Sequence, residues 1–305
     1  MLTYDLLFWF TGLTMSNLNC VLLCSFLGLF SLSVSAQQST DWMPAHSFTS
    51  GVEGPAVDRQ GNLYAVNFAK QGTIGIISGQ DKGEIFLTLP GNSIGNGIRF
   101  DQEHNMYIAD YVNHQVFKYH LKSKKLIVYA QNNAMNQPND LAIMENGILF
   151  ASDPKWSTGT GNIWRINLDG STSLLANDMD TTNGIEVSPD NQYLYVNESV
   201  QRNVWRFRLT ANGGISNKTL FYHFNDHGMD GMRTDKYGNL YIARYGAGEI
   251  AVLSPQGKLL KTLSLKGRFP TNVAFGGIEG KQLFVTMQKR GTIETLYLDT
   301  AGRNF

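Results

Sequence analysis

The chain has 305 residues, with 25 Lys and Arg against 25 Asp and Glu, so its formal net charge at pH 7 is zero. This balance provides no electrostatic attraction to nucleic acid or to an anionic membrane surface, and we expect neither as a partner. Glycine is frequent (31 residues) and proline is sparse (8), while branched aliphatic and aromatic residues dominate the apolar set. Such a composition favours many short strands joined by tight turns.

The N-terminal segment, residues 1–36, has the pattern of a cleaved secretory signal peptide. Residues 21–34 are apolar apart from serines, and a Val-Ser-Ala sequence ending at Ala36 supplies the small residues of a cleavage site. No Lys or Arg precedes this run, so Met15 is an alternative start. We therefore predict a secreted or periplasmic protein without stable membrane insertion after cleavage. An uncleaved N-terminal membrane anchor is the alternative.

Both cysteines, Cys20 and Cys24, lie inside this leader. A mature chain of residues 37–305 has no cysteine, which excludes a disulfide and a thiolate metal site from it. Any metal ion in the mature chain must be held by oxygen or by histidine.

One pattern recurs six times in the rest of the chain. Each copy has a polar residue, a small or apolar pair, a strand, a turn with Gly or Asn, and a second strand. The copies begin at Glu53, Asn96, Asn139, Asn183, Asp230 and Thr271, at intervals of 43, 43, 44, 47 and 41 residues. This spacing predicts an all-β fold, a six-bladed β-propeller with four-stranded blades that forms a single domain over residues 37–305. A β-sandwich or two unrelated β domains would not require so regular a repeat.

The last repeat is incomplete, because the chain ends after its third strand. We expect the N-terminal stretch Pro44–Ser50 to supply the missing outer strand. An N-terminal strand that closes the last blade leaves no exposed sheet edge at the seam.

The residue that opens each repeat should face the central channel, because the first strand of a propeller blade lines it. All six of these residues carry a side-chain oxygen, and two, Glu53 and Asp230, are carboxylates. Carboxylate and amide oxygens favour a hard divalent cation, with Ca²⁺ the first choice and Mg²⁺, Mn²⁺ or Zn²⁺ as alternatives. A ring of Asn and Asp side chains that stabilises Asn-Gly and Asp-Gly turns is the other interpretation.

Five ordered motifs at blade spacing carry a family resemblance. They are GVEGPAVDRQGNLYAV, QPNDLAI followed by FASDP, NGIEVSPDNQYLYV, DGMRTDKYGNLYIARYGAGEIAVLSPQGKLL and PTNVAFGG. Together they resemble the senescence-marker-protein/gluconolactonase (regucalcin-like) family of six-bladed propellers over nearly the whole mature chain. The resemblance implies a divalent ion, usually calcium, held by Glu53, Asn183 and Asp230, with Asn139 as a further ligand or substrate contact.

The resemblance also implies an activity, that of a lactonase, which is a carboxylic ester hydrolase. Our hypothesis is that the ion polarises the lactone carbonyl while Asp230 acts as the base toward water. A phosphotriester hydrolase in the same cage and a non-catalytic binding propeller with a structural ion are the alternatives. Two positions depart from the family: Gln137 stands where many sugar lactonases have Arg, and Met287 stands near the histidine position of the fluoridate hydrolases.

We expect the substrate to be a small lactone or ester and the protein to be a monomer. The expected substrate contacts are Asn96, Asn139, Gln137, His227 and Thr271. His227 lies three residues before Asp230, in the loop that enters the same strand. A solvated loop histidine is the other interpretation. Lys155 and Trp156 lie in a loop that could cover the channel.

Overall fold

The computed structural model describes residues 38–305, and these residues belong to one compact unit. The predicted signal peptide therefore lies outside the described residues. No helix within residues 38–305 has both the length and the apolar character needed to cross a membrane. The predictions of export and of a monomer stay predictions.

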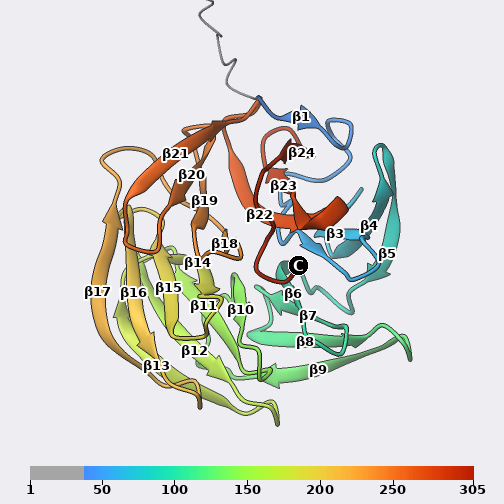
Figure 1. The fold of residues 1–305 in the computed structure, drawn as a ribbon. Helices are drawn as coiled ribbons and strands as arrows, with labels where there is room; N and C mark the ends of the chain where they lie inside the picture. The colour runs from blue at the N-terminus through green and yellow to red at the C-terminus, as the bar shows by residue number, and fades with distance from the viewer. Residues whose placement is uncertain (1–37) are drawn as a thin grey trace, which may run out of the picture. The chain divides into compact units, whose positions relative to one another are not determined.

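Six four-stranded antiparallel sheets follow one another around a central axis, which confirms the six-bladed propeller (Figure 1). Blade 1 consists of β2 (Ala56–Val57), β3 (Leu63–Val66), β4 (Thr73–Gly79) and β5 (Lys82–Thr88). Blade 2 consists of β6 (Gly95–Phe100), β7 (Asn105–Asp110), β8 (Gln115–His120) and β9 (Lys125–Gln131). Blade 3 consists of β10 (Leu141–Ile143), β11 (Leu149–Lys155), β12 (Thr160–Ile166) and β13 (Thr172–Met179).

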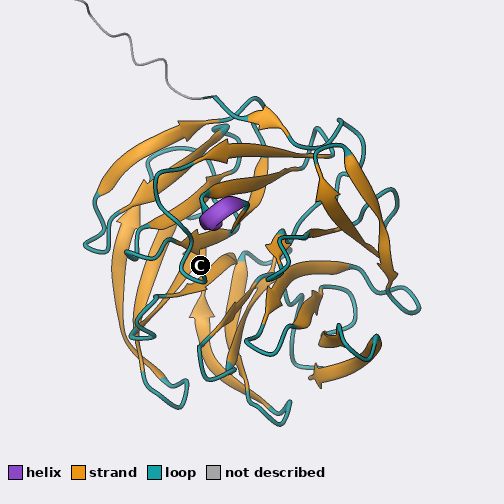
Figure 2. Cartoon of the chain, turned by 45° about the vertical axis from the view of Figure 1, so that its right-hand side comes forward, coloured by secondary structure: helices purple, strands orange, loops and turns teal. Residues whose placement is uncertain are grey.

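The remaining three blades repeat this order. Blade 4 consists of β14 (Thr182–Val187), β15 (Tyr193–Glu198), β16 (Asn203–Leu209) and β17 (Ile215–His223). Blade 5 consists of β18 (Met232–Thr234), β19 (Leu240–Arg244), β20 (Glu249–Leu253) and β21 (Leu259–Ser264). Blade 6 consists of β22 (Pro270–Gly276), β23 (Gln282–Met287), β24 (Thr292–Tyr297) and β1 (Thr40–Asp41). The 3-10 turn η1 (Ile278–Gly280) between β22 and β23 is the one helical segment of residues 38–305 (Figure 2).

An N-terminal strand closes the last blade as predicted, but the predicted segment was wrong. The outer strand is β1, in which Thr40 pairs with Thr295 and Asp41 with Glu294 of β24. In the segment Pro44–Ser50 the backbone turns instead, with His46 at a left-handed φ of 65°. Arg290 fixes the register at the seam, because its guanidinium donates to both carboxylate oxygens of Asp41 at 2.7 and 2.9 Å.

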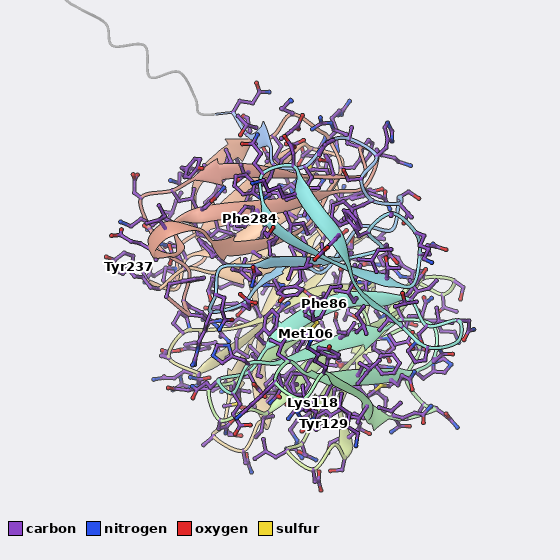
Figure 3. All side chains as sticks on the ribbon, turned by 90° about the vertical axis from the view of Figure 1, so that its right-hand side faces the viewer. Phe86, Met106, Lys118, Tyr129, Tyr237 and Phe284 are labelled. Atoms are coloured by element: carbon purple, nitrogen blue, oxygen red, sulfur yellow. The ribbon has the colours of Figure 1, made fainter. Side chains whose placement is uncertain are left out.

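The apolar core lies between the blades. Each of the six interfaces between neighbouring blades is filled by one cluster of buried side chains, including the interface of blades 6 and 1 at the seam. The second strand of a blade packs against neighbours on both faces, so β7 is buried along its whole length and reads as a nearly continuous apolar run. The outer strands face water on one side, as the partly exposed β9 does. Figure 3 labels Tyr129 of β9 and Lys118 of the neighbouring strand β8, whose ammonium lies 5.4 Å from the centre of the Tyr129 ring.

The turn inside the repeat explains the recurring Asp-x-x-Gly-Asn-Leu-Tyr letters. Asp58 accepts hydrogen bonds from the backbone N–H groups of Gln60 and Asn62, each at 2.9 Å, and from the Tyr64 hydroxyl. Gly61 takes the left-handed conformation, with φ of 85°, that ends the turn. The same arrangement recurs at Asp235 in blade 5. The repeat therefore has a local structural cause that is separate from the residue at its opening.

Candidate functional site

The six residues that open the repeats come together in space. All of them line one cavity of about 770 Å³ at one end of the channel: Glu53, Asn96, Asn139, Asn183, Asp230 and Thr271. The six blades thus contribute one polar residue each to a common site, as the repeat predicts. We call these six residues the ring residues and the cavity that they line the ring cavity.

The glycines that follow three of these residues allow neighbouring blades to approach closely. Gly97 donates its backbone N–H to the carbonyl of Asn139 at 2.8 Å, and Gly231 donates to the carbonyl of Thr271 at 2.7 Å. A Cβ atom on Gly184 would lie 2.4 Å from the carbonyl oxygen of Asp230. These contacts join one blade to the next, so the Asn-Gly and Asp-Gly pairs do not form the turns of the alternative interpretation.

Glu53 and Asp230 form a coupled pair of carboxyl groups. The pKa of Glu53 is raised to about 7, mainly because of burial and next because of the negative charge of Asp140, while a hydrogen bond from the Gly54 N–H acts in the opposite direction. Burial also raises the pKa of Asp230 well above its usual value, and the charge of Glu53 adds to that shift. Two carboxylates held this close in a buried site require a positive partner or a shared proton.

Two amide oxygens in the same cavity have no hydrogen-bond donor. Asn139 Oδ1 and Asn183 Oδ1 are buried and unpartnered. A buried acceptor without a partner costs about 1–3 kcal/mol. Across residues 38–305 no three His, Cys, Asp or Glu side chains come together as a metal site, so an ion in this cavity would depend on these amides. Two carboxylates and two free amide oxygens are a donor set that fits Ca²⁺.

The other two ring residues use their side chains differently. Asn96 donates its side-chain amide to the carbonyl of Asn139 at 3.1 Å. Thr271 directs its hydroxyl to Val52 at 2.9 Å and to the hydroxyl of Thr286 at 2.8 Å. Both residues therefore already hold the wall of the cavity together.

Among the predicted substrate contacts, His227 lines the cavity and Gln137 does not. Gln137 instead donates its backbone N–H to Asp153 at 2.6 Å, outside the cavity wall. Of the covering loop, Trp156 lines the cavity and Lys155 does not. Met287 is buried between blades 5 and 6, and the next residue, Gln288, reaches the cavity.

A second set of polar residues, which sequence reasoning missed, fixes the loops that carry the ring. They follow the ring residue of their blade by 14 or 15 positions, at or near the end of the second strand: Asn67, Asp110, Asp153, Glu198 and Arg244. Each bonds to the loop before the ring residue of its own blade, as Asp110 does to the N–H of Ile94 and Glu198 to the N–H of Asp180. We call these five residues the loop anchors. A polar residue stands at or near the end of the second strand in each of these repeats, and this signal could have identified them.

Two further residues next to the ring were also missed. Asn272, rather than Thr271, contacts a carboxylate of the pair, because its side-chain amide donates to Glu53 Oε2 at 3.0 Å. Asp140 lies beside Asn139 and is fully buried, where it pairs with Arg99 at 3.1 Å and with Arg233 at 3.4 Å.

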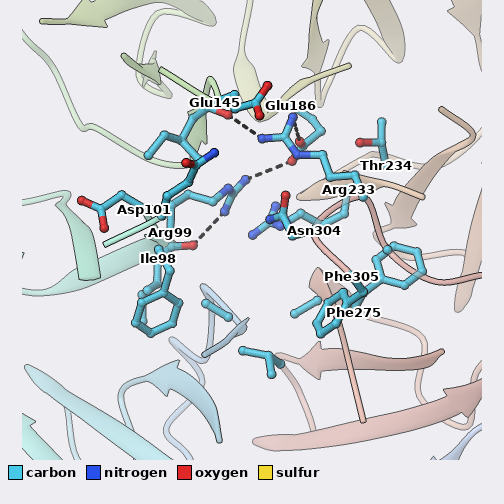
Figure 4. Close-up of a pocket in the computed structure, with 18 of the residues that line it drawn as sticks. Ile98, Arg99, Asp101, Glu145, Glu186, Arg233, Thr234, Phe275, Asn304 and Phe305 are labelled. Atoms are coloured by element: carbon cyan, nitrogen blue, oxygen red, sulfur yellow. Dashed lines mark hydrogen bonds and ion pairs between the residues drawn. The ribbon is translucent and has the colours of Figure 1, made fainter. Parts of the chain in front are cut away.

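These arginines extend toward a second cavity, of about 510 Å³, at the other end of the inner strands. Figure 4 shows Arg99, Arg233 and Glu186 there, together with the C-terminal residues Asn304 and Phe305. The adjacent Arg303 pairs with Glu186 at 3.2 Å. The channel is thus filled by charged pairs between the two cavities.

Comparisons with known proteins agree with this architecture. A crystal structure of a calcium-binding protein, regucalcin, from Agrobacterium tumefaciens has a TM-score of 0.76 at 20% identity, over 87% of this chain and 96% of that one. At that identity the likeness shows the fold alone.

Two curated relatives match in sequence. The gluconolactonase of Zymomonas mobilis is 26% identical over 63% of this chain and 60% of its own length. The regucalcin of Sus scrofa is 30% identical over 43% of this chain and 45% of its own length. The chain thus spans about half the length of the curated relatives it matches.

The family model described as the SMP-30/gluconolactonase/LRE-like region matches residues 52–289. This range contains all six ring residues and all five loop anchors. The chain belongs to the SMP-30/gluconolactonase/LRE-like family.

Proposed function

We propose that the protein is a lactonase that depends on a divalent cation, with Ca²⁺ as the preferred ion. One observation carries the proposal: two unpartnered amide oxygens and two coupled carboxyl groups line one cavity. Membership of a family with lactonases, and the gluconolactonase name of the Zymomonas mobilis relative, support the reaction class. The calcium-binding description of the Agrobacterium tumefaciens neighbour supports the ion.

Glu53, Asn139, Asn183 and Asp230 would hold the cation. When bound, the cation would polarise the lactone carbonyl and offset the negative charge that develops on its oxygen. Asn272 would keep the Glu53 carboxylate in place through its hydrogen bond. The loop anchors would fix the backbone around these residues.

Asp230 would act as the base toward the attacking water. Its carboxylate takes a proton from water as the water oxygen bonds to the carbonyl carbon. The ring C–O bond then breaks, and the leaving ring oxygen receives that proton from Asp230. The product is the open hydroxy acid, and Asp230 returns to its starting state.

The cavity wall is suited to a small polar ring. Besides the six ring residues, it contains His227, Trp156, Tyr111, Tyr245 and Gln288. These side chains combine apolar faces with hydrogen-bonding groups, which is the usual construction of a small-molecule site.

A substrate panel tests the reaction class. The purified protein, saturated with calcium, is assayed against sugar lactones, alkyl lactones and paraoxon, and the same panel is run on Asp230→Asn. We expect turnover of lactones, little turnover of the phosphotriester, and loss of lactone turnover in the variant. Turnover of paraoxon alone, or an Asp230→Asn variant with full activity, contradicts the proposal.

A further inference from the structure

Among the described residues 38–305, the wall of the ring cavity contains a single arginine or lysine, Arg202. It lies in the turn between β15 and β16 and has a left-handed φ of 63°, a conformation more usual for Gly or Asn. Two hydrogen bonds hold its backbone. The N–H of Arg202 donates to the carbonyl of Glu198 at 2.8 Å, and the carbonyl of Arg202 accepts from the N–H of Phe224 at 3.0 Å. The turn therefore presents this side chain to the cavity from a fixed backbone.

The guanidinium of Arg202 has no anionic partner within residues 38–305. It takes part in none of the ion pairs of the described chain, and its Nε atom is buried without a hydrogen-bond acceptor. Arg99, Arg233, Arg244 and Arg290, by contrast, each pair with a carboxylate. A half-buried guanidinium that lines a cavity and lacks an acceptor can be satisfied by a ligand.

The charges in the cavity favour an anion at this place. A divalent cation between Glu53 and Asp230 would neutralise both carboxylates, and the rest of the wall around Arg202 is neutral apart from His227. Arg202 would then supply the remaining positive charge. A guanidinium binds planar or tetrahedral oxyanions through two parallel hydrogen bonds.

We propose that Arg202 forms an anion subsite, so that the natural lactone carries a negatively charged substituent, a carboxylate, sulfonate or phosphate. The proposal rests on the proposed lactonase function. The substituent would bind to Arg202 while the carbonyl group of the lactone lies beside the ring residues of the protein. The subsite contributes to binding rather than to the chemical step, so it acts mainly on KM.

Two lactones that differ in charge test the subsite. The probes are γ-carboxy-γ-butyrolactone and its neutral carboxamide, assayed with the calcium-saturated wild type, Arg202→Gln and Arg202→Lys. In Arg202→Gln we expect KM for the carboxylate to rise about tenfold, the usual size of one charge-assisted hydrogen bond, while KM for the carboxamide stays within about twofold. Arg202→Lys should restore part of the difference. Equal changes for both lactones would overturn the proposal.

Arg208→Gln is the matched control. Arg208 lies on β16 of the same blade, is exposed and points away from the cavity toward Gln192, so the substitution removes the same charge elsewhere. We expect both lactones to behave as with the wild type. If Arg208→Gln raises KM for the carboxylate as much as Arg202→Gln does, the effect is general electrostatics and the subsite is refuted.

A binding measurement separates the subsite from the proposed function. Pyroglutamate and pyroglutamide are lactams of matched shape that resist hydrolysis, and their affinities are measured by calorimetry. We expect pyroglutamate to bind about tenfold more tightly than pyroglutamide in the wild type and equally in Arg202→Gln. This result without lactone turnover would keep the subsite and reject the lactonase. Lactone turnover without charge discrimination, or the absence of pyroglutamate binding, would reject the subsite.

Discussion

Asn272 donates a hydrogen bond of 3.0 Å to Glu53, across a separation of 219 residues in the chain. Asn272 belongs to the last blade and Glu53 lies just before the first strand of blade 1, so this bond crosses the seam of the propeller. The closure of the ring and the position of one candidate cation ligand are therefore coupled.

Substitution of Asn272 tests this coupling. In Asn272→Leu, Glu53 loses its side-chain donor, and we expect calcium affinity to fall about tenfold, as is usual when a group that orients a ligand is removed. The seam is held mainly by β1 and by Arg290, so the fold should persist. Isothermal titration with calcium measures the affinity, and circular dichroism checks the fold. Unchanged calcium affinity in a folded variant would show that Glu53 does not need this bond.

Asn183 provides a sharper test of the ligand set. Its Oδ1 atom accepts no hydrogen bond. Asn183→Leu therefore removes a candidate ligand oxygen, and no hydrogen-bond donor loses its acceptor when that oxygen is removed. We expect calcium affinity to fall on the order of 100-fold or more, while the free energy of unfolding in chelator does not fall by more than about 1 kcal/mol. Asn183→Asp keeps an oxygen at the same place and should retain binding. Equal calcium affinities of the Leu variant and the wild type would remove Asn183 from the ligand set.

The chelated protein should lose stability as the pH rises. The pKa of Glu53 is raised from 4.5 to about 7 in the folded state, so the folded protein retains a proton that the unfolded chain releases at lower pH. The free energy of unfolding is then highest near pH 4.5 and falls as the pH rises toward 7, and the raised pKa of Asp230 acts in the same direction. Asp41 does not interfere, because its pKa is lowered to about 2 and its contribution changes only in more acidic solution.

Thermal unfolding between pH 5 and pH 8, with chelator and with calcium, measures this effect. We expect the midpoint to fall with pH in chelator and to be restored by calcium at the upper end, where the carboxylates are ionised. A midpoint in chelator that rises over this range would contradict the assignment of a buried carboxyl pair.

The loop anchors should matter for stability. Asp153 is fully buried and accepts the N–H groups of Asn136 and Gln137 and the indole N–H of Trp164, at 2.7, 2.6 and 2.8 Å. Asp153→Ala leaves these donors unpaired, and we expect the free energy of unfolding to fall by about 3 kcal/mol. Urea denaturation measures the loss. Asp169→Asn, in an exposed turn, should change it by less than about 0.5 kcal/mol. Equal effects of the two substitutions would refute the anchoring role.

The repeat made much of the fold and of the ring predictable. A four-stranded blade needs one polar opening, one turn and one buried second strand, and this pattern of residue types recurs six times, with openings such as Glu53 and Asn96. The place of β1 was not predictable in this way, because a strand of two residues leaves no alternating pattern. Its position depends on the pairing of Asp41 with Arg290, 249 residues away.

The site was predictable only in the part that the repeat encodes. The ring residues occupy one column of the repeat, and the structure brings them together. The contacts of Gln137 were not encoded, because Asp153 binds its backbone N–H and holds it outside the cavity wall. Asn272 bonds to Glu53 across the seam, and Arg202 reaches the cavity from the turn between β15 and β16. No spacing within one repeat identifies either residue.

The most direct test of the account is the rate of glucono-δ-lactone hydrolysis before and after removal of divalent cations. The purified protein is treated with chelator, assayed by proton release, and assayed again after calcium is added back, with Asp230→Asn in parallel. We expect the enzymatic rate to disappear in chelator, to return with calcium in the wild type, and not to return in the variant. A wild-type rate that survives complete removal of the cation would contradict a cation-dependent lactonase.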